Sequence, residues 1–178
     1  LVETRYTDAL VFVINEANSY LPKNGWDIVV ITNKNIVKKL KDTSTPLHHQ
    51  KERKIIYKSI LNDTLDRNGY NSLMKKRDLY DNTLKEYDWL IFFQTDTTFC
   101  RPFKLFEWKS LSKFGYIGST WDNALVSPSK GFSCATLRDH SLPRAFIHVG
   151  NGGFSLRNRK QMIDIIDKWH RISGHLPY

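Results

Sequence analysis

Cysteine is scarce in this sequence, with only Cys100 and Cys134 among 178 residues. Two thiols with 33 residues between them provide neither a disulfide framework nor the close cysteine pairs of a zinc site. Both lie beside apolar residues, so we expect ordinary buried thiols. Long apolar runs are also lacking, because none approaches the roughly 20 residues of a membrane-spanning helix. We therefore expect no transmembrane segment in this chain.

Acidic residues are in deficit, with 18 Asp and Glu against 27 Lys and Arg and a formal net charge of +9. The excess is spread evenly: residues 1–87 carry 15 basic and 11 acidic groups, and residues 88–178 carry 12 and 7. A nucleic-acid-binding protein more often concentrates basic charge on one helix or in a tail. The even spread indicates a solvated basic surface or a general attraction to anionic substrates, with no nucleic acid as partner.

Aromatic residues are plentiful, with ten Phe, eight Tyr and five Trp, and 40% of the chain is apolar. This composition is typical of one globular core, so we expect a single domain over residues 1–178. The first residue is Leu1, and the segment Leu1–Arg5 resembles the end of a strand. We therefore interpret the domain as truncated at its start, and the family resemblance described below implies that it is truncated at its end as well. The compartment is left open.

Helical and strand patterns alternate along the chain. Apolar periodicity predicts helices over about 8–21, 35–40, 70–87 and 158–172, with Thr7 or Asp8 as the first cap. Apolar and β-branched runs predict strands over 26–32, 55–61, 88–94, 116–119 and 145–149, with a turn at Asn68–Gly69. This alternation favours an α/β fold with a mostly parallel central sheet flanked by helices. Ligands bind at the carboxyl ends of such strands, which here are residues 3–5, 32–34 and 94–98.

Three groups of residues have the chemistry of a site, and each has a structural alternative. Asp96 follows a buried strand and could hold Mg²⁺ or Mn²⁺, or cap a turn. Gly150, Gly152 and Gly153 allow positive φ and close approach to a ligand, or form a tight connection. Arg157 could pair with phosphate or be an exposed charge. No Ser/His/Asp or Cys/His arrangement stands out, so the catalytic residue is unknown.

Two motifs together resemble a known family. Phe92–Asp96 (FFQTD) and Val149–Arg157 (VGNGGFSLR) occur in order with VETR, GWDIVVIT and YIGSTW. This arrangement resembles a domain family of eukaryotes and giant viruses, long catalogued as of unknown function and related to GT-A nucleotide-sugar glycosyltransferases. The resemblance covers essentially the whole chain.

The resemblance implies a Rossmann-like GT-A fold and transfer of a sugar from a nucleotide-diphosphate donor to a glycan, protein or small-molecule acceptor. It also implies a Mn²⁺ or Mg²⁺ cofactor. In GT-A enzymes an Asp-x-Asp motif binds the metal and the donor, and Gln94-Thr95-Asp96 corresponds to it, with the carboxylate kept only at Asp96. We expect the metal at Asp96 and the substrate at Thr4, Arg5, Thr32, Gln94, Trp121, Gly150, Asn151, Gly152, Gly153 and Arg157.

Two rival functions stay open at this point. Gln94 in place of an acid is typical of an inactive GT-A-like module that binds a nucleotide or a sugar. The net charge of +9 is compatible, less favourably, with a nucleic-acid-binding domain.

Overall fold

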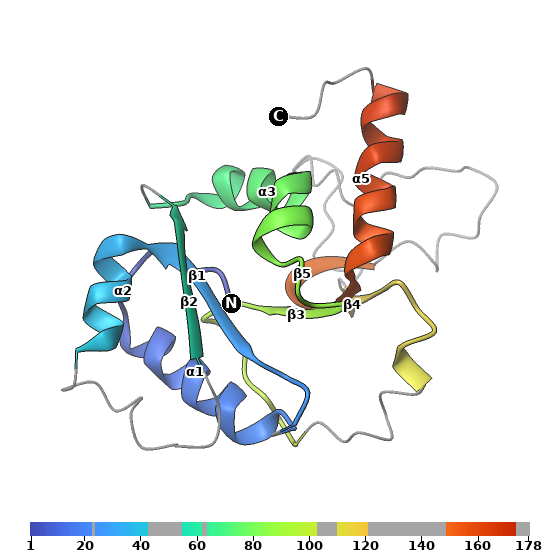
Figure 1. Ribbon diagram of the computed structural model, residues 1–178. Coiled ribbons are helices and arrows are strands. Elements are labelled where there is room, and N and C mark those ends of the chain that lie inside the picture. Colours follow the sequence, from blue (N-terminus) through green and yellow to red (C-terminus); the bar gives the residue numbers. More distant parts are fainter. Residues whose placement is uncertain (23, 43–54, 62–63, 103–109, 121–148, 174–178) are drawn as a thin grey trace, which may run out of the picture.

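Among the described residues, two small sheets and five helices, one of them a π-helical turn, make up a mixed α/β fold (Figure 1). The computed structural model describes the chain except for residues 23, 43–54, 62–63, 103–109, 121–148 and 174–178. The elements are α1 (Asp8–Tyr20), β1 (Ile28–Asn33), α2 (Lys34–Lys41), β2 (Ile55–Leu61), α3 (Arg67–Lys75), the π-helical turn η2 (Leu79–Thr83), β3 (Trp89–Phe93), β4 (Tyr116–Thr120), β5 (Val149–Asn158) and α5 (Arg159–Ser173). The α/β class is confirmed.

The first sheet is a parallel pair, in which Ile28 of β1 lies opposite Ile55 of β2. The free edge of β1 pairs with the start of the chain through a parallel bridge between Val2 and Ile31. The Ile31 N–H donates to the Leu1 carbonyl at 2.9 Å, and the Glu3 N–H donates to the Ile31 carbonyl at 3.1 Å. We call Leu1–Glu3 the amino-terminal segment. It runs along β1 on the side opposite β2.

The second sheet is antiparallel, in the order β3-β5-β4. The described strands therefore do not form a single, mostly parallel sheet. The expected α/β class holds, but the expected sheet does not. Sequence alternation cannot distinguish the two arrangements when the last strand inserts between two earlier ones. The long segment 121–148 precedes β5 and lies outside the described residues, as does most of the strand predicted over 145–149.

The sequence predicted that Gly150, Gly152 and Gly153 follow a strand. In the structure they lie within β5 itself. The register along β5 jumps from Ser155 to Asn151 while β4 advances only from Gly118 to Ser119, which is a bulge. Among the described residues, Gly25 is the only glycine with positive φ. The three glycines therefore lie in a strand that carries a bulge, a place where glycine is common.

The predicted helix over 70–87 is broken into α3 and η2, and the predicted turn at Asn68–Gly69 lies in the first turn of α3. Asp66 caps α3, since its carboxylate accepts from the Gly69 N–H at 2.7 Å. The helix stops at Lys76, and η2 then buries Tyr80 completely. Burial of this ring overrides the helix propensity of the charged run, a tertiary effect that local pattern does not report.

The amino-terminal segment lies where two apolar clusters meet. Leu1 belongs to a cluster with α1, β1 and Phe93, whereas Val2 belongs to a cluster with Tyr80, Leu90 and other residues around β3. Alternate residues of this segment therefore face opposite cores, as in a strand that is covered on both faces. The segment joins the two sheets.

Three other expectations concern the cysteines, the cap of the first helix and the membrane. Cys100 is exposed, so its predicted burial was wrong, and Cys134 lies outside the described residues. Thr7 caps α1 as predicted, its side chain accepting from the Leu10 N–H at 3.2 Å. Within the part of the chain that the structure describes, no helix has the length and apolar character needed to span a membrane.

Candidate functional site

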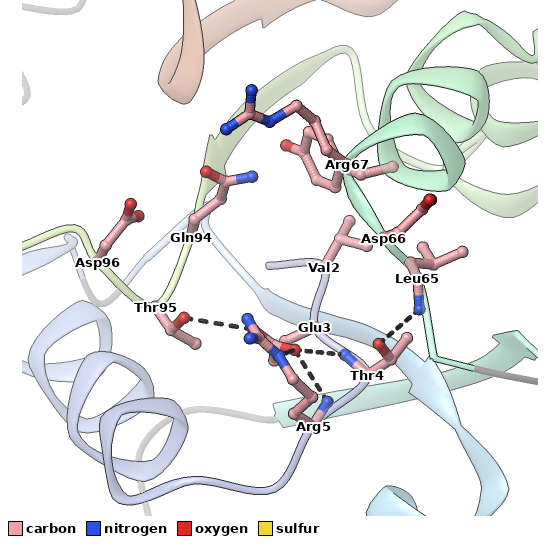
Figure 2. A pocket seen from close by; sticks show the side chains of 11 residues that line it. Val2, Glu3, Thr4, Arg5, Leu65, Asp66, Arg67, Gln94, Thr95 and Asp96 are labelled. Carbon is pink, nitrogen blue, oxygen red and sulfur yellow. Dashed lines mark hydrogen bonds and ion pairs between the residues drawn. The ribbon is translucent and has the colours of Figure 1, made fainter.

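A polar pocket of about 250 Å³ lies where the amino-terminal segment and β3 end and where α3 begins (Figure 2). It is lined by Val2, Glu3, Thr4, Arg5, Leu65, Asp66, Arg67, Tyr70, Gln94, Thr95 and Asp96. Three of the expected substrate residues, Thr4, Arg5 and Gln94, therefore meet Asp96 in one place. Strand ends converge here because the amino-terminal segment and β3 run in the same direction toward the pocket.

Glu3 and Arg5, which both line this pocket, form a forked ion pair. Arg5 Nε and Nη2 each lie 3.1 Å from a Glu3 carboxylate oxygen, and the backbone N–H groups of Thr4 and Arg5 donate to the same carboxylate at 2.8 Å. Burial alone would raise the pKa of Glu3, but these hydrogen bonds outweigh it and hold the pKa below its ordinary value. Glu3 is thus occupied by its own chain, and its carboxylate is a poor candidate for a metal ligand.

Thr4 is a buried anchor. Its hydroxyl accepts from the Leu65 N–H at 2.9 Å, and its carbonyl accepts from the Asn33 side-chain amide at 3.1 Å. These bonds fix the chain that leads into α3 beside the end of β1. Thr32 is fully buried, does not line the pocket, and its hydroxyl has no partner among the described residues.

The loop 94–99 links the two motifs of the sequence. The Thr97 hydroxyl donates to the Gly153 carbonyl at 3.2 Å and accepts from the Gln94 N–H at 3.3 Å. The other side of the loop is held by Glu16 of α1, whose carboxylate accepts from the Thr98 hydroxyl at 2.9 Å. The chain around Asp96 is therefore fixed to β5 and to α1 before any ligand binds.

Replacing Thr97 with valine is expected to loosen this loop. Valine has nearly the same shape but can neither donate to Gly153 nor accept from Gln94, so we expect a loss of about 1–2 kcal/mol in the free energy of unfolding. Urea denaturation measures it. Thr97→Ser keeps the hydroxyl and should stay close to the parent chain. Equal stability of the valine variant and the parent would show that the loop does not depend on this bond.

Tyr70 and Gln94 form the inner wall of the pocket. Burial is the main cause that raises the pKa of the Tyr70 phenol, and the Gln94 side chain hydrogen-bonds to it. Asp96 is exposed at the rim. In Figure 2 the side chains of Arg67, Gln94 and Asp96 lie around the opening.

The pocket carries a small net negative charge, since Glu3, Asp66 and Asp96 outnumber Arg5 and Arg67. Asp66 is used as the cap of α3, and Glu3 is held by Arg5, which leaves Asp96 as the carboxylate that is available to a ligand. The described residues hold no group of three or more His, Cys, Asp or Glu side chains able to bind a metal on their own.

Arg157 lies behind the pocket and does not line it. The residue is 6% exposed, and its guanidinium carbon lies 4.6 Å from the ring centre of Phe92 and 5.5 Å from that of Tyr116. Its nitrogens donate to the Ser155 hydroxyl at 3.0 Å and the Tyr80 hydroxyl at 3.1 Å. It is therefore a buried cation, neither an exposed charge nor a residue in direct reach of the pocket.

The remaining expected residues are only partly placed. Gly153 contacts the loop through its carbonyl, and the backbone of Gly150, Asn151 and Gly152 lies in β5. Trp121 lies outside the described residues. Sequence reasoning missed Leu65, Arg67 and Tyr70, because the sequence 68–69 was interpreted as a turn. The Asp66 to Gly69 spacing is an N-cap pattern that would have placed a helix start here.

Comparison with known proteins gives one match. A family model described as "Protein of unknown function (DUF5672)" matches residues 54–176, which is more than half of the chain. No curated protein and no solved structure matches the chain significantly.

Proposed function

The chain belongs to the DUF5672 family, and we propose that it is a glycosyltransferase-like domain that transfers a sugar from a nucleotide-diphosphate donor to an acceptor. The matched family is described as one of unknown function. The match therefore supports membership of such a family and does not bear on the relation to glycosyltransferases. The Rossmann-like GT-A fold and the sugar-transfer activity belong to this proposal.

One observation carries the proposal: Gln94–Asp96 line a polar pocket at the end of β3, and Thr97 hydrogen-bonds to Gly153 of the second motif. The two motifs on which the resemblance rests are therefore neighbours in space, although the bonded residues are 56 positions apart in the sequence. Ligands of α/β proteins bind at strand ends of this kind. A pocket of about 250 Å³ holds part of a nucleotide sugar, so the rest of the donor would extend beyond it.

The charges of the lining favour a donor that arrives with a divalent cation. A diphosphate is repelled by a pocket with three acidic and two basic residues unless a cation offsets it. Mg²⁺ and Mn²⁺ are commonly held by one or two carboxylates together with substrate phosphates, and the available carboxylate of Asp96 fits that role. The bound metal would supply electrostatic stabilisation of the departing diphosphate.

The chain's own residues would then orient the donor. Arg67 and Arg5 lie at the pocket and can pair with phosphate oxygens, which for Arg5 means that Glu3 and the phosphate share the guanidinium. Tyr70 offers a ring face, and Gln94 offers an amide for hydrogen bonds to the ribose or sugar. Trp121 and residues 150–153 stay proposed contacts of the sugar or the acceptor.

A second candidate is a module that binds the nucleotide without transferring the sugar. Gln94 stands where an Asp-x-Asp motif has its first acid, which leaves a single carboxylate and favours weak metal binding. The sugar, the acceptor and the general base are left open by both candidates.

Asp96→Asn is expected to weaken Mn²⁺-dependent binding of UDP or GDP at least tenfold while the fold is kept, because the amide is neutral. Calorimetric titration with and without Mn²⁺ measures this. Asp164→Asn, on the exposed face of α5, is the matched control and should bind like the parent chain.

A screen of UDP- and GDP-sugars then separates the two candidates. Release of nucleoside diphosphate from one donor by the parent chain, lost in Asp96→Asn, supports a transferase. Metal-dependent binding of a donor without turnover supports the binding module. Identical Mn²⁺-dependent affinity in the parent and Asp96→Asn chains would sink the assignment of Asp96.

A further inference from the structure

Helix α5 carries apolar side chains on both of its faces. The inner face buries Ile163 and Ile166 in the apolar cluster around β3. The outer face carries Ile165, Trp169 and Ile172, which are 54%, 61% and 72% exposed. These three residues are four and then three positions apart, so they lie along one side of the helix. Packing of the core therefore accounts for the inner face of α5 and leaves the outer face without a role in the fold.

A turn before β4 extends this apolar side past the amino end of α5. Phe114 is 50% exposed, and the Lys113 ammonium lies 5.1 Å from the centre of its ring. The next residue, Gly115, lies against the start of α5, because its carbonyl accepts from the Asn158 N–H at 2.8 Å and a Cβ there would meet the Gln161 side chain. We give the name apolar patch to the four exposed side chains Phe114, Ile165, Trp169 and Ile172. Figure 1 shows α5 (red) at the margin of the molecule, with its carboxyl end projecting beyond α3.

The apolar patch concentrates exposed apolar surface in one place. Among the described residues, eight large apolar side chains are exposed, and four of them belong to the patch. An aromatic side chain offers roughly 150–250 Å² and isoleucine somewhat less, so four side chains that are half to three-quarters exposed present about 400 Å². Single exposed apolar residues are ordinary, but a patch of this extent typically marks a contact with another molecule or with a membrane.

Basic side chains surround the apolar patch. Four exposed cations flank it, one in the turn and three on α5: Lys113, Lys160, Lys168 and Arg171. The helix has two acidic residues, and one of them, Asp167, is held in an ion pair by Arg77. Asp164 is therefore the one exposed carboxylate that α5 sets against these cations. The surface around the patch is positively charged.

Apolar side chains ringed by cations favour an anionic lipid surface as the partner. Apolar side chains enter the boundary between head groups and acyl chains, Trp is enriched at that depth, and Lys and Arg attract anionic head groups. A second copy of the chain fits less well, because two positively charged surfaces would face each other. The patch of about 400 Å² is also only half of the roughly 800 Å² that each partner buries in a stable protein interface.

We propose that α5 and the turn at Lys113–Phe114 form a membrane-contact surface, which binds reversibly to the head-group region of an anionic bilayer. The helix lies along the bilayer surface with Ile165, Trp169 and Ile172 inserted, while Lys168 and Arg171 contact the head groups. This arrangement requires no membrane-spanning helix. It is independent of the proposed sugar transfer, because none of these residues lines the polar pocket.

Co-sedimentation of the full chain with lipid vesicles tests the proposal, using pure phosphatidylcholine and phosphatidylcholine with about 30% phosphatidylserine. The double variant Ile165→Gln/Ile172→Gln removes apolar side chains and keeps every charge, and Gln supports a helix. Lys168→Gln/Arg171→Gln removes two cations and keeps the apolar patch. Phe12→Gln, which changes an equally exposed apolar residue on α1, far from α5 in Figure 1, is the matched control.

The parent chain and Phe12→Gln are expected to bind the anionic vesicles equally, and the neutral vesicles at least tenfold less tightly. Each double variant should bind the anionic vesicles at least tenfold less tightly than the parent, and added salt should weaken binding of the parent. Failure of the parent to bind anionic vesicles, equal binding to both kinds of vesicle, or full binding by Ile165→Gln/Ile172→Gln would overturn the proposal. A stable dimer of the parent that this variant abolishes would also overturn it, because a second copy would then cover the patch.

Discussion

Arg157→Ala is expected to lower the free energy of unfolding by about 3–5 kcal/mol, which is the range for large core truncations and for broken buried charge contacts. The substitution empties the space between the rings of Phe92 and Tyr116. It also removes the donors to the hydroxyls of Ser155 and Tyr80. A change of this size is a large part of the 5–15 kcal/mol that a domain usually has.

Two further variants separate the causes. Arg157→Met keeps much of the volume beside the rings and should lose less than Arg157→Ala if packing dominates. Arg171→Ala, on the exposed end of α5, is the matched control and should change stability by no more than about 0.5 kcal/mol. Urea denaturation of the four chains decides. A loss below 1 kcal/mol in Arg157→Ala would refute a structural role for the buried guanidinium.

Raising the pH from 5 to 8 is expected to stabilise the chain that begins at Leu1 by roughly 3 kcal/mol, at about 1.4 kcal/mol for each pKa unit. The folded Leu1 amino group has a pKa of about 5, against 8.0 when exposed. Between these values the unfolded chain holds the proton and the folded chain does not. Stability is therefore fully present above pH 8 and is lost as the pH falls toward 5.

Acetylation of the amino group isolates this effect, because the acetylated chain keeps its histidines and carboxylates but has no amine to titrate. Glu3 titrates below the window, since its pKa is lowered from 4.5. The difference in unfolding free energy between acetylated and free chains should shrink as the pH rises from 5 to 8. A difference that stays constant over this range would contradict the burial of a neutral amine.

The strand and helix positions were predictable where local pattern and tertiary environment agree. The β-branched run before Thr32 predicted β1, and the periodicity of residues 8–21 predicted α1 almost to its ends. The break after α3 was not predicted, because apolar periodicity continues through residues 76–87 and does not report the complete burial of Tyr80. The antiparallel place of β5 depends on pairing between distant segments, which periodicity does not encode.

The candidate site divides in the same way. The rule that ligands bind at strand ends pointed at residues 3–5 and 94–98, and Thr4, Arg5 and Gln94–Asp96 do line one pocket. It could not place Thr32, which ends a strand but points into the core. It also could not show that Glu3 holds Arg5, because such a pairing depends on how a short segment curls back on itself. Arg157 was interpreted as a phosphate partner or an exposed charge, and its burial between aromatic rings depends on packing that the sequence does not report.

The central position of β5 has a consequence for the order of events during synthesis. Phe93 pairs with Phe154, and Thr97 hydrogen-bonds to Gly153. The loop beside the polar pocket therefore cannot make its native contacts until β5 has been synthesised. At about 5–20 residues per second, the ribosome needs several seconds to deliver that strand. Until then the apolar strand β3 lacks its partner strand, and its backbone N–H and C=O groups are unpaired. During this interval the nascent chain is most prone to aggregate and to bind chaperones. Rare codons or a pause before residue 149 would lengthen that interval.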